Sequence, residues 1–334
     1  MNRQIITCTG YGGTGSSAIT DLLKEFSNGL SLGDVEFWFL QDYNGISDLE
    51  YFLIDGNHRS RVNLAIKRFK KYIDEYDKYY SKFFKNYKIN SLEYIENLID
   101  AKFQKSISYY ELDSKFKKLF WFKVSPLAQK IFAKILNKDF EEFSPYFPRD
   151  EKVYSIPHVE RFYTETKKYT KKLFDTLDKG YDFIAIDQLT PAMNAKRYLN
   201  YVENLKVVIV DRDPRDLFLL NELHWKKAAY ICDTTNIDEY ISWYRTMREH
   251  KKIEKVHKNI AYIMFEDLIY NYDVTLSKLY AFFEIDEKYH TQKKKFFNPD
   301  ISIQNTKLWE RYPKYRRNDV EKIKKELDEY CFKK

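Results

Sequence analysis

The sequence Gly-Tyr-Gly-Gly-Thr-Gly-Ser-Ser, residues 10–17, decides the fold class that we expect for this chain. It follows a short β-branched run at 4–9, which is typical of a strand. It precedes apolar residues at the spacing i, i+3, i+4 and i+7, which is typical of an amphipathic helix: Ile19, Leu22, Leu23 and Phe26. Asn28 and Gly29 are expected to end this helix. A strand, a Gly-rich loop and a helix in this order predict the opening of a parallel α/β sheet.

The Gly-rich loop fits the pattern G-x-x-x-x-G-x-S. Glycines let successive backbone N–H groups turn toward phosphate oxygens, and the helix start behind them adds a positive dipole end. We interpret the loop as a phosphate-binding loop; the alternative is a Gly-rich turn that packs the strand against the helix. A kinase or nucleotide triphosphatase has lysine before the last hydroxyl residue, where this chain has Ser16, and no clean Walker B aspartate accompanies the loop.

Further strands and helices follow in the second half of the chain. The continuous apolar runs at 181–187 and 206–211 are typical of buried parallel strands. Shorter runs at 35–40 and 261–265 predict two more strands, and the apolar spacing predicts helices from about Asp216 and at 237–247, 274–283 and 319–330. The predicted fold class is α/β: a parallel sheet with a P-loop-type strand-loop-helix, flanking helices and a large helical insertion.

The insertion is expected at about 62–177, where the sequence becomes rich in Lys, Tyr, Phe and Asp. A helical stripe is visible in its first part: Val62, Ile66, Phe69 and Ile73. Three prolines at 145, 148 and 157 predict a loop-like break at 144–158. We expect this segment to be an insertion or lid on a single α/β domain that spans 1–334, not an independent domain.

Composition limits the classes of function. The three cysteines are scattered and show no metal-ligand spacing, which favours reduced thiols in a reducing compartment. The N-terminus enters a strand without an apolar leader, and no apolar run reaches the length of a membrane span. We therefore expect a cytoplasmic protein without an integral membrane span. The net charge of +7 is spread over Lys clusters that alternate with Asp and Glu, which favours a mixed solvated surface over a nucleic-acid site and suits anionic ligands.

A second motif, Arg-Asp-Pro-Arg-Asp at 212–216, follows directly after the predicted strand at 206–211. Ligands of parallel α/β sheets bind at the carboxyl ends of the strands, and arginine suits bidentate capture of phosphate. Arg212 and Arg215 are therefore candidate phosphate ligands. The alternative is that Arg–Asp pairs order a turn before the next helix.

The loop and the 212–216 motif, together with Phe-Glu-Asp-Leu at 265–268 and the helix at 274–283, resemble the PAPS-dependent sulfotransferase family of bacterial, carbohydrate-acting type. Thr-Gly-Ser-Ser at 14–17 stands where the family has S-G-T-S/T. The stretch 187–191 is similar to the D-K-x-P segment before the arginine strand. The stretch 305–309, followed by Tyr312, is similar to the late segment that covers the donor nucleotide. The middle of the chain has no counterpart in this resemblance.

The resemblance implies 3′-phosphoadenosine 5′-phosphosulfate (PAPS) as donor and no metal. The implied ligands of the 5′-phosphosulfate are Gly12, Gly13, Thr14, Gly15, Ser16 and Ser17, and Arg212 is the implied ligand of the 3′-phosphate. Gly13 departs from the family's Lys or Arg at this place, so Lys307, Arg59 or Arg61 becomes the candidate replacement. Leu220 departs from the family's 3′-phosphate serine, and the adjacent Asn221 is the candidate substitute.

Sulfuryl transfer needs a base near the acceptor hydroxyl. Glu36 is the first candidate because the glutamate-then-aromatic stretch at 36–39 is similar to carbohydrate sulfotransferases; the alternative is a solvent-facing glutamate on an edge strand. Asp187, at the end of its predicted strand, is the second. His58 and His224 are further candidates, although a lone histidine is more often structural. His250 and His257 are set aside because they lie on a charged helix.

The hypothesis from sequence is a sulfotransferase that acts on a hydroxyl or amine of a carbohydrate or glycolipid, in polysaccharide biosynthesis of an AT-rich bacterium. The aromatic residues of the insertion would then shape the acceptor cleft. A P-loop kinase of another class and a catalytically inactive nucleotide-binding relative are the alternatives.

Overall fold

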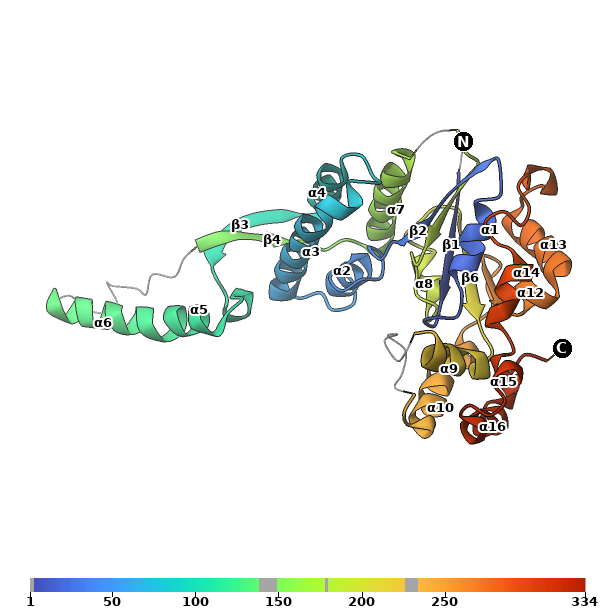
Figure 1. Cartoon of the computed structure of the whole chain (residues 1–334). Helices are drawn as coiled ribbons and strands as arrows, with labels where there is room; N and C mark the ends of the chain where they lie inside the picture. Colours follow the sequence, from blue (N-terminus) through green and yellow to red (C-terminus); the bar gives the residue numbers. More distant parts are fainter. Residues whose placement is uncertain (1–2, 138–148, 178–179, 226–233, 334) are drawn as a thin grey trace. The chain divides into compact units, whose positions relative to one another are not determined.

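The structure, a computed structural model, describes residues 3–137, 149–177, 180–225 and 234–333 (Figure 1). It consists of two compact units. Unit 1 comprises residues 1–46, 82–85 and 166–334, and unit 2 comprises residues 47–81 and 86–165. The expected insertion at 62–177 overlaps unit 2 but begins and ends later in the sequence.

Unit 1 is built on a five-stranded sheet with the order β2-β5-β1-β6-β7. The strands are β1 (Gln4–Gly10), β2 (Gly29–Glu36), β5 (Phe183–Asp187), β6 (Leu205–Asp211) and β7 (Ile260–Met264). All neighbouring strands pair in parallel, which confirms the predicted fold class. Every residue of β5 and β6 is buried, as the continuous apolar runs predict.

The position of β1 in the sheet places the Gly-rich loop. This strand lies between β5 and β6, with Cys8 opposite Asp187 and Gly10 opposite Val210. The loop therefore leaves the centre of the sheet beside the carboxyl ends of two other strands. This edge is where parallel α/β sheets bind their ligands.

Helices pack around this sheet. They are α1 (Ser17–Leu23), α8 (Ala195–Tyr198), α9 (Pro214–Leu223), α10 (Ile237–Thr246), α11 (His250–Ile253), α12 (Asp267–Tyr270), α13 (Tyr272–Phe283), α14 (Pro299–Ser302), α15 (Leu308–Arg311) and α16 (Arg317–Glu326), together with the 3-10 turns η3 (Glu287–Tyr289), η4 (Ile303–Asn305) and η5 (Asp328–Tyr330). The apolar stripe of α1 packs in one core with residues of β1, β6 and α13, among them Ile19, Leu22, Val208 and Leu279. The helices expected from about Asp216 and at 237–247, 274–283 and 319–330 are confirmed.

The second strand differs from the prediction. We expected it at 35–40, whereas β2 spans Gly29–Glu36 and pairs with β5 from Gly29 onward. Phe37 and Phe39 are fully buried outside the strand, and both rings contact Phe84, at 5.6 and 6.0 Å between ring centroids. Their apolar character therefore reflects aromatic packing and not strand pairing. Helix α1 also ends at Leu23, before the expected stop at Asn28.

Unit 2 is mainly helical. Its elements are α2 (Ile46–Leu53), α3 (Arg59–Tyr80), α4 (Tyr87–Leu98), β3 (Ala101–Ser106), η1 (Tyr109–Glu111), α5 (Lys115–Leu119), η2 (Phe120–Val124), α6 (Ser125–Ile135) and β4 (Arg149–Tyr154). Helix α2 starts at the last residue of unit 1, and α7 (Val159–Asp175) begins in unit 2 and ends in unit 1. The stripe predicted at Val62, Ile66, Phe69 and Ile73 is buried in α3.

An antiparallel pair of strands in unit 2 was not predicted. Strand β3 pairs with β4 along its whole length, from Ala101 opposite Tyr154 to Ser106 opposite Arg149. Strand β4 lies inside the segment 144–158, so the expected loop-like break is wrong for 149–154. A buried ion pair between Lys152 and Glu111, at 2.5 Å, fixes β4 against η1. Pro145 and Pro148 lie outside the described residues.

A buried ion pair anchors the carboxyl end of β6. Asp211 Oδ1 accepts a hydrogen bond of 2.6 Å from Arg248 Nη2, and Asp211 Oδ2 accepts one of 2.5 Å from Lys251 Nζ. The Arg248 guanidinium is fully buried, at 3.3 Å from the ring centroid of Tyr244 and 4.3 Å from that of Tyr11. Burial alone would raise the pKa of Asp211, but the charges of Arg248 and Lys251 hold it below its ordinary value. The pair ties β6, the residues after α10 and the Gly-rich loop together.

We expect Arg248→Met to lower the free energy of unfolding by about 3–5 kcal/mol, because it removes one of the two cations that pair with the buried Asp211 carboxylate. Urea denaturation followed by circular dichroism measures this change. Arg245→Met is the matched control, because the Arg245 side chain in α10 is 40% exposed and its pair with Glu326 spans 3.7 Å, so its loss should cost about 0–1 kcal/mol. Equal urea midpoints for the two variants would contradict the role of Arg248.

Candidate functional site

The Gly-rich loop has the backbone conformation that an anion cradle needs. Gly12, Gly13 and Gly15 have φ angles of 86°, 65° and 94°, in the left-handed region that L side chains rarely adopt. Within the described part of the chain, none of their three N–H groups donates a hydrogen bond. These donors lie at the wall of a cavity of about 720 Å³ and are available to the oxygens of an anion.

Close packing fixes the shape of this loop. Tyr11 N donates to Thr14 Oγ1 at 3.2 Å, and Thr14 is buried. A Cβ atom at Gly10 would lie 2.0 Å from Thr14 Oγ1, and one at Gly15 would lie 2.6 Å from the Phe265 ring. Gln188 Nε2, at the end of β5, donates to Ser16 Oγ at 3.0 Å. Thr14 and Ser16 therefore hold the loop from inside, while the glycine N–H groups remain unused.

The cavity brings distant parts of unit 1 together. Its wall is formed by the Gly-rich loop, the ends of β2 and β5, the start of the 212–216 motif and the segment at 296–305. The chemically active side chains in this wall are Ser16, Asp21, Glu36, Asp187 and Arg212. The predicted site residues that line this cavity are Gly12, Gly13, Gly15, Ser16, Ser17, Glu36, Asp187 and Arg212, whereas Thr14, Asn221 and Lys307 do not line it.

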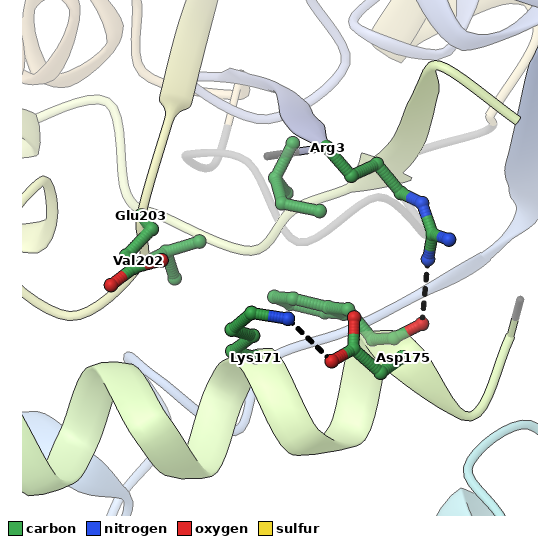
Figure 2. A pocket seen from close by; sticks show the side chains of 7 residues that line it. Arg3, Lys171, Asp175, Val202 and Glu203 are labelled. Atoms are coloured by element: carbon green, nitrogen blue, oxygen red, sulfur yellow. Dashed lines mark hydrogen bonds and ion pairs between the residues drawn. The ribbon is translucent and has the colours of Figure 1, made fainter. Parts of the chain in front are cut away.

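A second pocket lies where β1 begins and is a poor candidate. Figure 2 shows it between Arg3, Lys171, Asp175, Val202 and Glu203. Its volume of about 20 Å³ is room for little more than one water molecule. Lys171 pairs with Asp175 at 2.5 Å, and Arg3 Nη1 donates to the carbonyl oxygen of Phe174 at 3.3 Å. Its charged groups are thus engaged with the protein itself.

Arg212 lies beside the Gly-rich loop in the cavity wall. Its Nη2 donates to the carbonyl oxygen of Asn305, and its Nη1 lies 3.5 Å from the carbonyl oxygen of Gly13. The guanidinium stacks on Phe265, 4.4 Å from the ring centroid. Its Nε is buried without a partner among the described residues. Burial lowers the pKa of Arg212, but an arginine keeps its charge in proteins. Arg212 is therefore a buried cation that lines the cavity.

Arg215 has a different role. It donates to both carboxylate oxygens of Asp213, at 3.0 and 2.6 Å, and stacks on Trp309 at 3.7 Å from the ring centroid. Asp213 also caps α9 by accepting from the backbone N–H of Arg215 at 2.8 Å. In the 212–216 motif, Arg215 therefore forms the Arg–Asp pair that orders the turn before α9. Arg212 instead lines the cavity.

Asp216 attaches the late segment of the chain to α9. Its carboxylate accepts from the backbone N–H groups of Lys307 and Leu308, at 2.9 and 2.7 Å. Burial raises the pKa of Asp216 to about 7. The side chain of Lys307 is not part of the cavity wall: its Nζ lies 5.2 Å from the ring centroid of Tyr270 and 3.8 Å from Glu310. The stretch 305–309 therefore contributes Asn305, and not the side chain of Lys307, to the cavity wall.

Glu25 is a structural residue of the site that sequence reasoning missed. Its carboxylate lies 2.6 Å from His290 Nε2 and accepts from the backbone N–H groups of Lys294, Phe296 and Phe297. Burial would raise the pKa of Glu25, but these hydrogen bonds hold it below its ordinary value. Phe296 and Phe297 line the cavity, so Glu25 positions part of its wall from 271 residues away in the sequence.

The two candidate bases are neighbours. Glu36 and Asp187 stand opposite each other at the ends of β2 and β5. Asp187 is buried and its Oδ1 has no partner in the described structure. Burial, reinforced by the charge of Glu36, raises the pKa of Asp187 to about 7. Glu36 is exposed and accepts from Trp38 Nε1 at 3.1 Å. A carboxyl group that exchanges its proton near pH 7, beside an accessible carboxylate, is suited to general acid–base chemistry.

The remaining predicted residues lie away from the cavity wall. Asn221 is buried and donates to Thr234 Oγ1 at 2.9 Å. His58 caps α3, and Arg59 and Arg61 follow it, all in unit 2. His224 is the exposed C-cap of α9.

His250, which the sequence analysis set aside, contacts the Gly-rich loop. Its Nε2 lies 2.8 Å from the hydroxyl of Tyr11, and its Nδ1 lies 3.0 Å from Glu254. His250 thus supports the loop from behind. Across the described residues no group of three or more His, Cys, Asp or Glu side chains is placed to hold a metal ion. In the same residues no helix has the length and apolarity that a bilayer crossing requires.

No family model and no curated protein matches this chain. Among solved structures, the chain is similar to sulfotransferases. A sulfotransferase domain from the curacin biosynthetic pathway has 12% identity and a TM-score of 0.41, with 98% of each chain covered. A retinol dehydratase in complex with androsterone and inactive cofactor PAP has 11% identity and a TM-score of 0.36, with 99% of this chain and 82% of that chain covered. Sulfotransferase STF9 from Mycobacterium avium has 11% identity and a TM-score of 0.35, with 98% and 76% covered. At these identities and TM-scores, the likeness assigns no activity, donor or acceptor to this chain.

We expect Asp187→Asn to stabilise the protein at pH 8 by up to about 4 kcal/mol and progressively less toward pH 4. The folded carboxyl keeps its proton up to a pKa of about 7, whereas the unfolded one releases it near 3.8, so this carboxyl costs the wild type stability as the pH rises between these values. Urea denaturation at pH 5 and pH 8 measures the difference. Asp182→Asn is the control, because Asp182 is exposed and its partner Asn28 is at the surface. A pH-independent effect of Asp187→Asn would show that the buried carboxyl is ionised throughout.

Proposed function

We propose that this chain is a PAPS-dependent sulfotransferase. The observation that carries the proposal is the meeting of the Gly-rich loop with Arg212, 199 residues away from Gly13, at one cavity. The loop offers three unused N–H donors, and Arg212 offers a buried cation with an unpartnered Nε. Two phosphate-binding elements at separate places suit a ligand with two separate phosphate groups, and a cavity of about 720 Å³ has the size of small-molecule sites.

The donor would lie with its 5′-phosphosulfate on Gly12, Gly13, Thr14, Gly15, Ser16 and Ser17 and its 3′-phosphate on Arg212. When bound, it supplies the sulfuryl group and leaves as adenosine 3′,5′-bisphosphate. The role of the protein is to align an acceptor oxygen with the sulfur, opposite the breaking bond to the 5′-phosphate. The backbone donors of the loop stabilise the charge that develops on the phosphate and sulfuryl oxygens. Lys307 contacts Tyr270 and Glu310, and Asn221 donates to Thr234. For either residue to bind the donor, these contacts would have to change.

The acceptor side of the proposed reaction lies at Glu36 and Asp187. Glu36 is the base, because it is exposed at the cavity and can reach an incoming hydroxyl or amine. It takes the proton as the acceptor–sulfur bond forms. Asp187 acts as a positioning residue: its pKa of about 7 leaves it only partly ionised at neutral pH, which reduces the negative charge near the anionic donor.

A carbohydrate or glycolipid is the proposed acceptor class. Trp38 and Trp225 line the same cavity as Glu36, and Trp38 is 46% exposed. Flat aromatic faces of this kind suit the apolar faces of sugar rings. Location in the cytoplasm and a part in bacterial polysaccharide biosynthesis remain predictions from the sequence.

One observation favours a second candidate, a nucleotide-binding relative without transfer activity. Of the described residues that line the cavity, Arg212 is the single lysine or arginine, while Asp21, Glu36 and Asp187 are acidic. The loop therefore supports binding by backbone donors more strongly than it supports charge neutralisation in the transition state. A P-loop kinase of another class is the third candidate, distinguished by Mg²⁺-dependent turnover of ATP.

We expect Arg212→Met to weaken binding of adenosine 3′,5′-bisphosphate about 100-fold, the equivalent of about 3 kcal/mol for a lost charge-assisted hydrogen-bond network. Isothermal titration calorimetry measures the affinity, and circular dichroism verifies the fold. Lys307→Met is the matched control and should change the affinity less than about 3-fold, because the Lys307 side chain points to Tyr270 and Glu310. Absence of bisphosphate binding by the wild type, or its persistence in Arg212→Met, refutes the proposed donor site.

We expect Glu36→Gln to reduce transfer of labelled sulfate from PAPS by about 10²- to 10⁴-fold, because the acceptor proton loses its base. Asp187→Asn keeps the neutral form of that side chain and should cost less than Glu36→Gln. Both variants should bind the bisphosphate as tightly as the wild type. A larger loss in Asp187→Asn assigns the base to Asp187, and a wild type that binds bisphosphate but transfers no sulfate supports the inactive relative.

A further inference from the structure

The segment 115–136 of unit 2, which we name the basic arm, is a continuous helical stretch with an unusual surface. It consists of α5, η2 and α6 together with Leu136. Large apolar side chains along it are exposed to solvent, among them Phe116 at 77%, Leu127 at 60%, Phe132 at 59% and Ile135 at 71%. Side chains of this type and size are normally covered in a folded protein. In the described part of the chain, these side chains of the arm form an apolar surface that faces solvent.

The exposed apolar residues of α6 share one face. Leu127, Ile131 and Ile135 follow each other at intervals of four residues, which places them in a row along the helix. Ala133, which lies on another side of the helix, is buried. The aliphatic row therefore lies on a side of the helix that faces solvent.

The charge of the arm has a single sign. Its 22 residues contain six lysines and no aspartate or glutamate: Lys115, Lys117, Lys118, Lys123, Lys130 and Lys134. Acidic residues make up 50 of the 334 residues of the chain, roughly one in seven, so their absence here is a local departure. Lys117 pairs with Asp113, directly before the arm, at 2.9 Å, and the net positive charge of the arm is complementary to a negative surface.

We propose that the basic arm docks this protein on an anionic lipid surface. A helix that combines lysines with Phe, Trp and Leu side chains lies in the plane of a membrane interface, with its apolar face among the acyl chains and its lysines among the headgroups. Phe116, Phe120 and Trp121 add the aromatic side chains that favour this interface. At about 1.5 Å per residue the arm is about 30 Å long, and lying flat brings all of this length into contact.

Other occupants of the same face fit less well. A second copy of the arm would bring six lysines against six lysines, which like-charge repulsion opposes. A nucleic acid would pair with the lysines and stack on the aromatic rings, but Leu127, Ile131 and Ile135 offer neither phosphate nor base contacts. A membrane interface uses both the charged and the aliphatic side of the arm.

Co-sedimentation with vesicles tests the proposal. We expect the full chain to bind vesicles of 70% phosphatidylcholine and 30% phosphatidylserine at least 10-fold more tightly than vesicles of phosphatidylcholine alone. The triple variant Leu127→Asp, Ile131→Asp, Ile135→Asp should lose at least 10-fold in binding, and the variant Lys130→Glu, Lys134→Glu should lose most of the preference for phosphatidylserine. All five positions are exposed, so the variants should fold.

Ile253→Asp, Val256→Asp is the matched control, because these residues are 82% and 94% exposed in unit 1 and should leave vesicle binding unchanged. Three results would overturn the proposal: no binding to anionic vesicles, equal loss in control and arm variants, or arm-dependent dimerisation or oligonucleotide binding without vesicle binding. The inference does not depend on the proposed function. Affinity for adenosine 3′,5′-bisphosphate, measured on the same variants, should stay unchanged, so failure of either proposal is visible by itself.

Discussion

The pairing of Asp211 with the buried Arg248 is the interaction on which the geometry of the site depends. A guanidinium without any solvent contact is tolerated only because Asp211, Tyr244 and Tyr11 surround it. Tyr11 is the first residue of the Gly-rich loop after β1, and its ring packs against the buried guanidinium of Arg248. This contact fixes the start of the loop. Asp211 also accepts from the backbone N–H of Arg212 at 2.8 Å. The same carboxylate thereby orients both the Gly-rich loop and Arg212.

Burial also decides which charges the cavity presents. Three acidic residues lie near Arg212, yet each is engaged elsewhere. Asp213 pairs with Arg215, Asp216 accepts backbone N–H groups, and Glu266 accepts from the backbone N–H of Asp213 at 3.0 Å. Burial further raises the pKa of Glu266 to about 8, so this group is largely neutral at pH 7. Arg212 therefore keeps an effective positive charge toward a ligand although its surroundings are formally acidic.

The sequence predicted the parts of the fold that depend on local patterns. Strands β1, β5 and β6 were found because buried parallel strands are continuous apolar runs, and β7 was found from a short apolar run although it is only half-buried. Strand β2 was misplaced because Phe37 and Phe39 are buried by aromatic packing beyond the strand end. Strand β3 was missed because all of its residues are exposed, so no alternation marks it. Motif spacing likewise identified Arg212, Asp187 and Glu36, which the structure brings to one cavity.

The contacts that hold this site could not be read from local patterns. Glu25 and His290 are 265 residues apart, and a single glutamate after a helix carries no signal of such a partner. The contact of His250 with Tyr11 spans 239 residues and was hidden by the charged helix around the histidine. The different roles of Arg212 and Arg215 did have a signal in the sequence. Asp213 before Pro214 is a typical helix N-cap, and the residue that it binds in the first turn is Arg215.

Gly13 shows how the loop works without a cation of its own. Its φ of 65° suits glycine, and a lysine there would adopt a left-handed conformation at a cost of roughly 1–2 kcal/mol. Arg212 supplies a positive charge instead, with its Nη1 3.5 Å from the Gly13 carbonyl oxygen. Under the proposed function this guanidinium binds the 3′-phosphate, and the loop N–H groups bind the phosphosulfate. On that proposal, charge that develops on the bridging oxygen is met by the backbone dipoles of the loop. Such dipoles stabilise it only if the loop is rigid, and the packing of Thr14, Phe265 and Gln188 around the loop supplies that rigidity.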